Sequence, residues 1–242
     1  MAGFLDAASE QFNQALSEFV KLDDAIEEAQ TLDCLSTVYQ VEGRYDDAEA
    51  LLLRAIEINQ AYENEEGLSV NYGNMAFLHK HRKEYDKAES YLRKGAAIDE
   101  AMERRDGIAD YHVQMGELFY QRDDWEQAEN HLLIAIKKHK ELNNLIGIGA
   151  ARSNLGVLYR LQGDLKRSEQ MTLKALEMAE EMEQADFIAT TLDELATLRK
   201  AQGRLDEAKQ LWTRSLALFK ELKSSRMIDE VQQQLDAYDP QL

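Results

Sequence analysis

The sequence predicts an all-α protein built as a solenoid, in which pairs of helices are stacked one on the next. Only one of the 242 residues is proline, and the helix-favouring residues Ala, Glu, Leu, Lys and Gln are abundant. The apolar fraction of 44% is ample for a packed core. Above all, one pattern returns with a constant period along the chain, which is typical of repeat architectures.

The repeated pattern joins a turn to the start of a helix. Each copy contains a large apolar residue followed three residues later by a small one, and a second small residue comes seven positions further on. Small residues at a helix crossing let two backbones approach closely. The five copies are GRYDDA at 43–48, KEYDKA at 83–88, DDWEQA at 123–128, GDLKRS at 163–168 and GRLDEA at 203–208, so the period is 40.

Each repeat contains two helical patterns separated by a turn. In the fourth copy, Leu155, Leu158 and Tyr159 follow the i, i+3, i+4 spacing of one helical face. A second such pattern begins at Leu165. Between them, Gly163 is suited to the left-handed residue that ends the first helix, and Asp164 to the N-cap of the second.

These residues resemble the tetratricopeptide repeat, and the match extends over essentially the whole chain. The period of 40 exceeds the usual 34 and the usual closing proline is absent, as in the longer repeats of kinesin light chains, polarity adaptors and many bacterial signalling proteins. The resemblance implies a right-handed superhelix of about twelve helices whose first helices line the concave side. The residues that carry it in the fourth copy are Leu155, Gly156, Tyr159, Gly163, Leu165, Ser168, Thr172 and Ala175.

Both ends of the chain align with half a repeat. Residues 3–19 match a second helix, and residues 226–238 match a first helix. Phe4, Phe12 and Phe19 suggest that the N-terminal helix has a face that needs covering, so we expect this end to contact another molecule. The predicted organisation is a single solenoid over 1–242, with a half repeat or cap at 1–22, full repeats at 23–63, 64–103, 104–143, 144–183 and 184–223, and a capping helix at 224–242.

Charge and composition narrow the possible partners. The net charge is −18, and residues 1–66 hold 16 acidic but only 3 basic residues. Phosphate backbones would be repelled, so nucleic acid is not expected as a partner. The acidic N-terminal third favours a basic partner, although it is also read simply as a solubilising surface. No apolar run is long enough to span a membrane, and the single Cys34 fits a reducing compartment, so a cytoplasmic protein is expected.

The sequence offers little for catalysis or for a cofactor. The five histidines show no metal-ligand spacing, and no pairing of a nucleophile with a base stands out among the evenly distributed carboxylates. We therefore predict no catalytic residues, no metal and no cofactor.

The resemblance places peptide-recognition residues on the first helices. The position just before the shared Leu or Met is an amide in three of the five repeats, and the family commonly uses an asparagine there to pair with a peptide backbone. A purely structural hydrogen bond to a neighbouring helix is the alternative. Lys80, Arg160 and Lys200 are equivalent and would favour a peptide that carries Asp, Glu or a free carboxylate. The expected peptide-binding residues are Asn74, Gln114, Asn154, Phe77, Lys80, Tyr120, Arg160 and Lys200.

The sequence therefore predicts a non-enzymatic module that binds an extended or helical segment of another protein. Two alternatives stay open. One is a scaffold that forms homo-oligomers through its terminal helices, and the other is the sensor part of a larger signalling protein.

Overall fold

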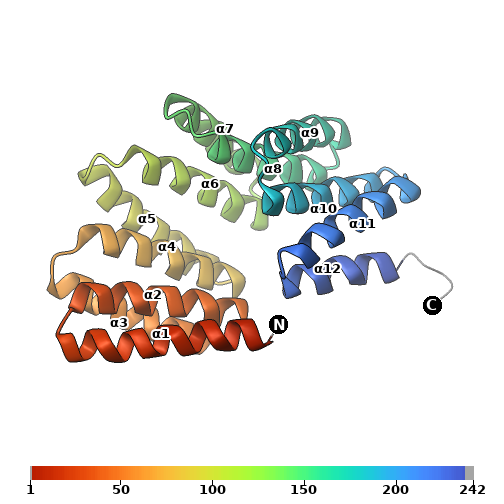
Figure 1. The fold of residues 1–242 in the computed structure, drawn as a ribbon. Coiled ribbons are helices and arrows are strands. Elements are labelled where there is room, and N and C mark those ends of the chain that lie inside the picture. The colour runs from red at the N-terminus through yellow and green to blue at the C-terminus, as the bar shows by residue number, and fades with distance from the viewer. Residues whose placement is uncertain (1, 238–242) are drawn as a thin grey trace. The chain divides into compact units, whose positions relative to one another are not determined.

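A computed structural model describes residues 2–237, with residues 2–7 and 225 in backbone only. The described residues form twelve helices and contain no strand, which confirms the predicted all-α fold (Figure 1). The helices are α1 (Ala2–Leu22), α2 (Ala25–Val41), α3 (Tyr45–Ala61), α4 (Glu65–His81), α5 (Tyr85–Ala101), α6 (Arg105–Gln121), α7 (Trp125–Glu141), α8 (Leu145–Leu161), α9 (Leu165–Glu181), α10 (Ala185–Ala201), α11 (Leu205–Glu221) and α12 (Ser225–Asp236).

Each sequence repeat consists of two segments of equal length, and each segment is one helix with the turn that follows it. Each helix from α2 to α11 has 17 residues, which corresponds to about 25 Å, and a three-residue turn follows it. The middle residue of every turn has a positive φ, between 51° and 81°, although only three of these residues are glycine. They are Asp23, Gly43, Glu63, Lys83, Glu103, Asp123, Asn143, Gly163, Glu183, Gly203 and Lys223.

Each turn ends one helix and begins the next. After α8, the Gly163 N–H donates to Arg160 O at 3.0 Å and the Asp164 N–H donates to Tyr159 O at 2.8 Å, which is the Schellman arrangement. Asp164 is also the N-cap of α9, since its Oδ1 accepts from the Arg167 N–H at 3.0 Å. The roles predicted for Gly163 and Asp164 are confirmed.

The repeated small residues lie in the core, where the two helices of a repeat cross. Ala48, Ala128 and Ala208 are each fully buried, as are the second small residues Ala135 and Ala175. Large apolar side chains fill the space beside them, and the buried Trp212 is the largest. This packing matches the steric role that the sequence predicted for the small positions.

The chain divides into two compact units, residues 1–111 and 112–242, and the boundary falls within α6. In the first unit, α1 packs on α2, α2 on α3, α3 on α4 and α4 on α5, and the first helices α2 and α4 also touch directly. In the second unit, consecutive helices from α7 to α12 pack in the same way, and α8 touches α10. A continuous single solenoid with the repeat boundaries given above stays a prediction.

Three successive repeats bury a polar side chain against a glycine. Asn59, Asp99 and His139 occupy equivalent positions near the ends of second helices, and each is at most 5% exposed. A Cβ at the glycine eight residues later would lie 2.7 Å from Asn59 Cγ, 2.2 Å from Asp99 Oδ2 or 2.3 Å from His139 Nδ1. The polar side chain and the absence of a Cβ are therefore coupled features of these three repeats. The three glycines are Gly67, Gly107 and Gly147.

The N-terminal helix α1 packs on α2 through part of its surface only. Phe12 and Phe19 are half-buried, whereas Val20 and Leu22 are 48% and 72% exposed. The Phe4 side chain lies outside the described residues. Within residues 2–237, the helices are all too short or too polar to cross a lipid bilayer.

Candidate functional site

Asn74, the first of the predicted recognition residues, is held by a carboxylate on the preceding first helix. Its Nδ2 donates to Asp33 Oδ1 at 2.8 Å and to Asp33 Oδ2 at 3.0 Å. Asn71, one turn earlier on α4, donates to the same Asp33 Oδ1 at 2.8 Å. Asn74 therefore has the structural role that the sequence left open as the alternative, although its Oδ1 accepts no hydrogen bond from the described residues.

The contact between Asn74 and Asp33 follows a register that recurs in the second unit. Asp33 and Asn74 are 41 positions apart, and so are Ser153 and Glu194, which share a short hydrogen bond between α8 and α10. One repeat plus one residue thus separates facing positions on neighbouring first helices. Sequence reasoning missed this role of Asp33, although the spacing is visible once the period of the repeat is known.

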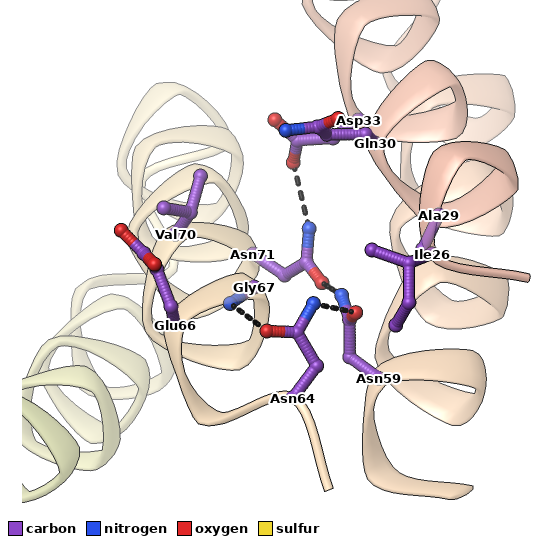
Figure 2. Close-up of a pocket in the computed structure, with 10 residues that line it drawn as sticks. All are labelled: Ile26, Ala29, Gln30, Asp33, Asn59, Asn64, Glu66, Gly67, Val70 and Asn71. Atoms are coloured by element: carbon purple, nitrogen blue, oxygen red, sulfur yellow. Dashed lines mark hydrogen bonds between the residues drawn. The ribbon is translucent and has the colours of Figure 1, made fainter. Parts of the chain in front are cut away.

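A cavity of about 270 Å³ lies between α2 and α4 in the first unit (Figure 2). Ile26 and Ala29 of α2 line one side and Val70 of α4 lines the other, while amide and carboxylate groups line the rest. The complete lining is Ile26, Ala29, Gln30, Asp33, Asn59, Asn64, Glu66, Gly67, Val70 and Asn71.

A chain of amide hydrogen bonds runs beside this cavity and ends on Asp33. Asn64 Nδ2 donates to Asn59 Oδ1 at 2.8 Å, Asn59 Nδ2 donates to Asn71 Oδ1 at 2.7 Å, and Asn71 donates to Asp33 (Figure 2). The Gly67 N–H starts the chain by donating to Asn64 Oδ1 at 3.2 Å. All the donors point the same way, so each bond polarises the next toward the carboxylate.

Phe77 and Lys80 flank Asn74 on α4. Phe77 is 41% exposed and Val70, on the same helical stripe, is 45% exposed. The Lys80 Nζ lies 4.9 Å from the centroid of the Phe77 ring, and the His81 ring lies 4.3 Å from it. This part of α4 therefore presents an accessible aromatic surface with a cation over it.

In the second unit, the Asn154 side chain forms fewer hydrogen bonds than that of Asn74. The residue 41 positions earlier is Val113, which has no polar group to receive the amide. Asn154 Oδ1 instead accepts a long hydrogen bond of 3.5 Å from the Tyr120 hydroxyl. Its Nδ2 donates to no group within the described part of the chain, and the side chain is half-buried on α8.

The other predicted residues of this unit differ in their availability. Arg160 is half-buried and forms no ion pair with any described residue, whereas Lys200 donates to Gln234 Oε1 at 3.1 Å and lies over the Trp212 ring. Tyr120 packs against the core around Leu155. Gln114 is half-buried on α6. The structure thus places Asn74, Phe77 and Lys80 in the first unit and Gln114, Tyr120, Asn154, Arg160 and Lys200 in the second.

Two carboxyl groups on α10, those of Asp193 and Glu194, lie among these residues of the second unit. Burial, with the nearby charge of Asp193, raises the pKa of Glu194 to about 7, although Ser153 donates a hydrogen bond to it and Arg160 opposes the shift. Burial also raises the pKa of Asp193, whose Oδ1 accepts from Trp212 Nε1 at 2.9 Å. The Tyr120 pKa is raised by burial and by the charges of Glu117 and Glu194. Arg160 therefore lies close to the two carboxyl groups of Asp193 and Glu194 on α10.

A pair of histidines contacts across α6 and α7. His112 Nδ1 and His131 Nδ1 are 3.0 Å apart, and burial together with His131 and Lys138 lowers the pKa of His112 to about 4. Among the described residues, no group of three or more His, Cys, Asp or Glu side chains could hold a metal ion.

Repeating helix pairs with exposed first-helix faces define a helical-repeat protein. The sequence profile of the tetratricopeptide repeat matches residues 27–101 and 107–181, more than half of the chain. The chain belongs to the tetratricopeptide repeat family.

Solved structures share this fold at low sequence identity. BtubC (BKLC) from P. vanneervenii superposes with a TM-score of 0.70 at 20% identity, over 90% of this chain and 92% of BtubC. NprR in complex with its cognate peptide NprX superposes with a TM-score of 0.77 at 14% identity, over 92% of this chain and 66% of NprR. A Rap protein complexed with Competence and Sporulation Factor superposes with a TM-score of 0.72 at 17% identity, over 97% of this chain and 70% of the Rap protein. A search of curated protein sequences finds no match.

Proposed function

We propose that this protein is a non-catalytic interaction module that binds an extended or helical segment of a partner protein along its first helices. A cytoplasmic location is part of the proposal, since the single Cys34 is an exposed free thiol. The observation that carries the proposal is the half-buried Asn154, whose amide nitrogen has no partner among the described residues. A peptide carbonyl would supply the missing acceptor.

The residues around Asn154 support this proposal. Arg160 lies on the same helix without an ion-pair partner in the described chain, so it remains available to a carboxylate of the bound segment. NprR, a structural neighbour at 14% identity, was solved with a bound peptide. That likeness concerns the fold, and peptide binding by the present chain rests on Asn154 and its surroundings.

The test is selection of linear peptides from a random displayed library, followed by affinity measurements on the selected peptides by fluorescence polarisation. Asn154→Ala removes one backbone-directed hydrogen bond and should weaken binding by about 1 kcal/mol, several-fold in Kd. Asn130→Ala is the matched control, because Asn130 is an exposed asparagine on the second helix α7.

Circular dichroism must show that both variants are folded. Recovery of no binding peptide, or equal affinities for the wild type and a folded Asn154→Ala variant, would rule out this face as the binding site.

Self-association through α1 is a second candidate, favoured by the exposed Val20 and Leu22 at its end. Burying such apolar side chains between two copies would stabilise a dimer. Light scattering should then show a dimer that Leu22→Glu converts to a monomer. A wild-type monomer at high protein concentration would exclude this candidate.

A further inference from the structure

We propose that Asp33 and the cavity between α2 and α4 form a subsite for a primary alkylammonium group, the side chain of a lysine in the bound segment. This inference rests on the proposed peptide-binding function and deepens it by assigning one side-chain chemistry to one place in the first unit.

Asp33 is a preorganised carboxylate without a counter-charge. Its two oxygens are held by three hydrogen bonds from the neutral amides of Asn71 and Asn74. No cationic side chain of the described residues forms an ion pair with it, although it is half-buried. Neutral donors fix the position of the carboxylate but leave its negative charge in place, which favours a ligand that carries a positive charge.

The equivalent carboxylate in a later repeat has a hydrogen-bond donor from an aromatic side chain of its own repeat. Asp193 stands four repeats after Asp33, at the same repeat position, and accepts a hydrogen bond from the buried Trp212 indole. Asp33 has no comparable aromatic cover among the described residues and borders an accessible cavity instead.

The hydrogen bonds around Asp33 distinguish an ammonium from a guanidinium. Oδ1 already accepts from both Asn71 and Asn74, whereas Oδ2 accepts only from Asn74. Since each carboxylate oxygen has two favourable lone-pair directions, one strong position remains, on Oδ2. A point-like ammonium can use a single position, while a guanidinium binds best when both oxygens are open to its planar fork.

The cavity walls match the rest of a lysine side chain. Ile26 and Val70 are partly exposed and, with the buried Ala29, offer apolar surface to a chain of methylene groups. The exposed carboxylate of Glu66 and the amide of Gln30 lie in the lining as further acceptors. The strongly acidic sequence up to residue 66 adds a field that attracts cations.

The test uses capped amino acids as probes and nuclear magnetic resonance as the readout. N-acetyl-lysinamide should shift the side-chain amide signals of Asn71 and Asn74 saturably, with a Kd on the order of millimolar. N-acetyl-norleucinamide has a similar aliphatic stem without the charge and should bind at least about tenfold more weakly. N-acetyl-argininamide should bind more weakly than the lysine probe.

Two variants and a control locate the site. Asp33→Asn should weaken binding of the lysine probe about tenfold, and Val70→Trp, at a 45% exposed position, should block the cavity without touching the carboxylate. Glu57→Gln changes the net charge by the same amount at an exposed position of α3 and should leave the affinity unchanged.

Absence of saturable shifts with the lysine probe, equal binding of norleucinamide, tighter binding of argininamide, or full affinity in both folded variants would each overturn the assignment. These outcomes are separate from those of the peptide selection. A protein that selects peptides but gives no saturable shifts with the lysine probe would refute only the subsite. A functional subsite in a protein that selects no peptide would refute only the proposed function.

Discussion

Replacing Gly107 by alanine tests the coupling between the buried polar residues and their glycines. A Cβ at Gly107 would lie 2.2 Å from Asp99 Oδ2, whereas ordinary contact begins at 3.4 Å, so the carboxylate would have to withdraw by the difference between these two distances. That movement would break the 2.8 Å hydrogen bond that the Ser69 hydroxyl donates to Asp99 Oδ1.

The net effect is the difference between two opposing contributions. Alanine favours a helix over glycine by about 1 kcal/mol. Against this, losing a hydrogen bond to a buried charge costs about 1.5–3 kcal/mol and overpacking costs about 1–3 kcal/mol. We therefore expect Gly107→Ala to lower the free energy of unfolding by about 1.5–5 kcal/mol.

Gly73 provides the matched control, because it also lies within a first helix but a Cβ there would meet no atom within 4 Å. Gly73→Ala should raise the free energy of unfolding by about 0.5–1 kcal/mol. Both changes in the free energy of unfolding can be measured by urea unfolding followed by far-ultraviolet circular dichroism. Adding Asp99→Ala to Gly107→Ala should recover at least about 1 kcal/mol relative to additivity. If Gly107→Ala stabilises the protein as much as Gly73→Ala, the steric argument is wrong.

Two further predictions concern pH and turn geometry. Because the folded-state pKa of Glu194 is about 7 against an ordinary 4.5, the folded protein binds more protons there, and stability falls as pH rises from 4.5 to 7. Glu194→Gln should remove this loss, so that the free energy of unfolding rises by at most about 3 kcal/mol at pH 8 and changes little at pH 4.5. Urea unfolding at the two pH values measures the effect. An equal gain from Glu177→Gln, at an exposed position, would contradict the prediction. Glu103 has φ 56°, so Glu103→Gly should raise the free energy of urea unfolding by up to about 1 kcal/mol, whereas Glu100→Gly inside α5 should lower it. Equal effects at the two positions would refute the turn argument.

The fold was predictable because the period of 40 fixes both the number of helices and their partners. Gly163 and Asp164 identified one turn correctly, and the geometry of that turn recurs throughout the described chain. Nothing in the residue types of Glu63 or Lys83 indicates the same left-handed conformation. Helix packing on both sides imposes it, and local propensity disfavours it.

The candidate site was less predictable, because its chemistry depends on contacts between repeats. The sequence alone leaves open whether Asn74 pairs with a peptide or with a neighbouring helix, and it does not indicate that the amide donates to Asp33, which lies 41 positions earlier. It also groups Arg160 with the equivalent Lys80 and Lys200, and does not indicate that Glu194, with a pKa of about 7, lies close enough to interact with Arg160. Neither contact appears when each repeat is compared only with itself.

The spacing of contacts between neighbouring first helices explains which of the predicted recognition residues still have a free hydrogen-bonding group for a ligand. Side-chain hydrogen bonds between neighbouring first helices follow registers of 41, 34 and 38 positions: Asp33 with Asn74 and Ser153 with Glu194 in the first register, Tyr120 with Asn154 and Lys200 with Gln234 in the second, and Asp33 with Asn71 in the third. Asn154 faces an apolar Val113 in the first register and makes only a long bond in the second, so its amide nitrogen remains available to a ligand. By contrast, the equivalent Asn74 donates its amide hydrogens to Asp33, so only its oxygen is available, while the Asp33 carboxylate forms no ion pair within the described residues.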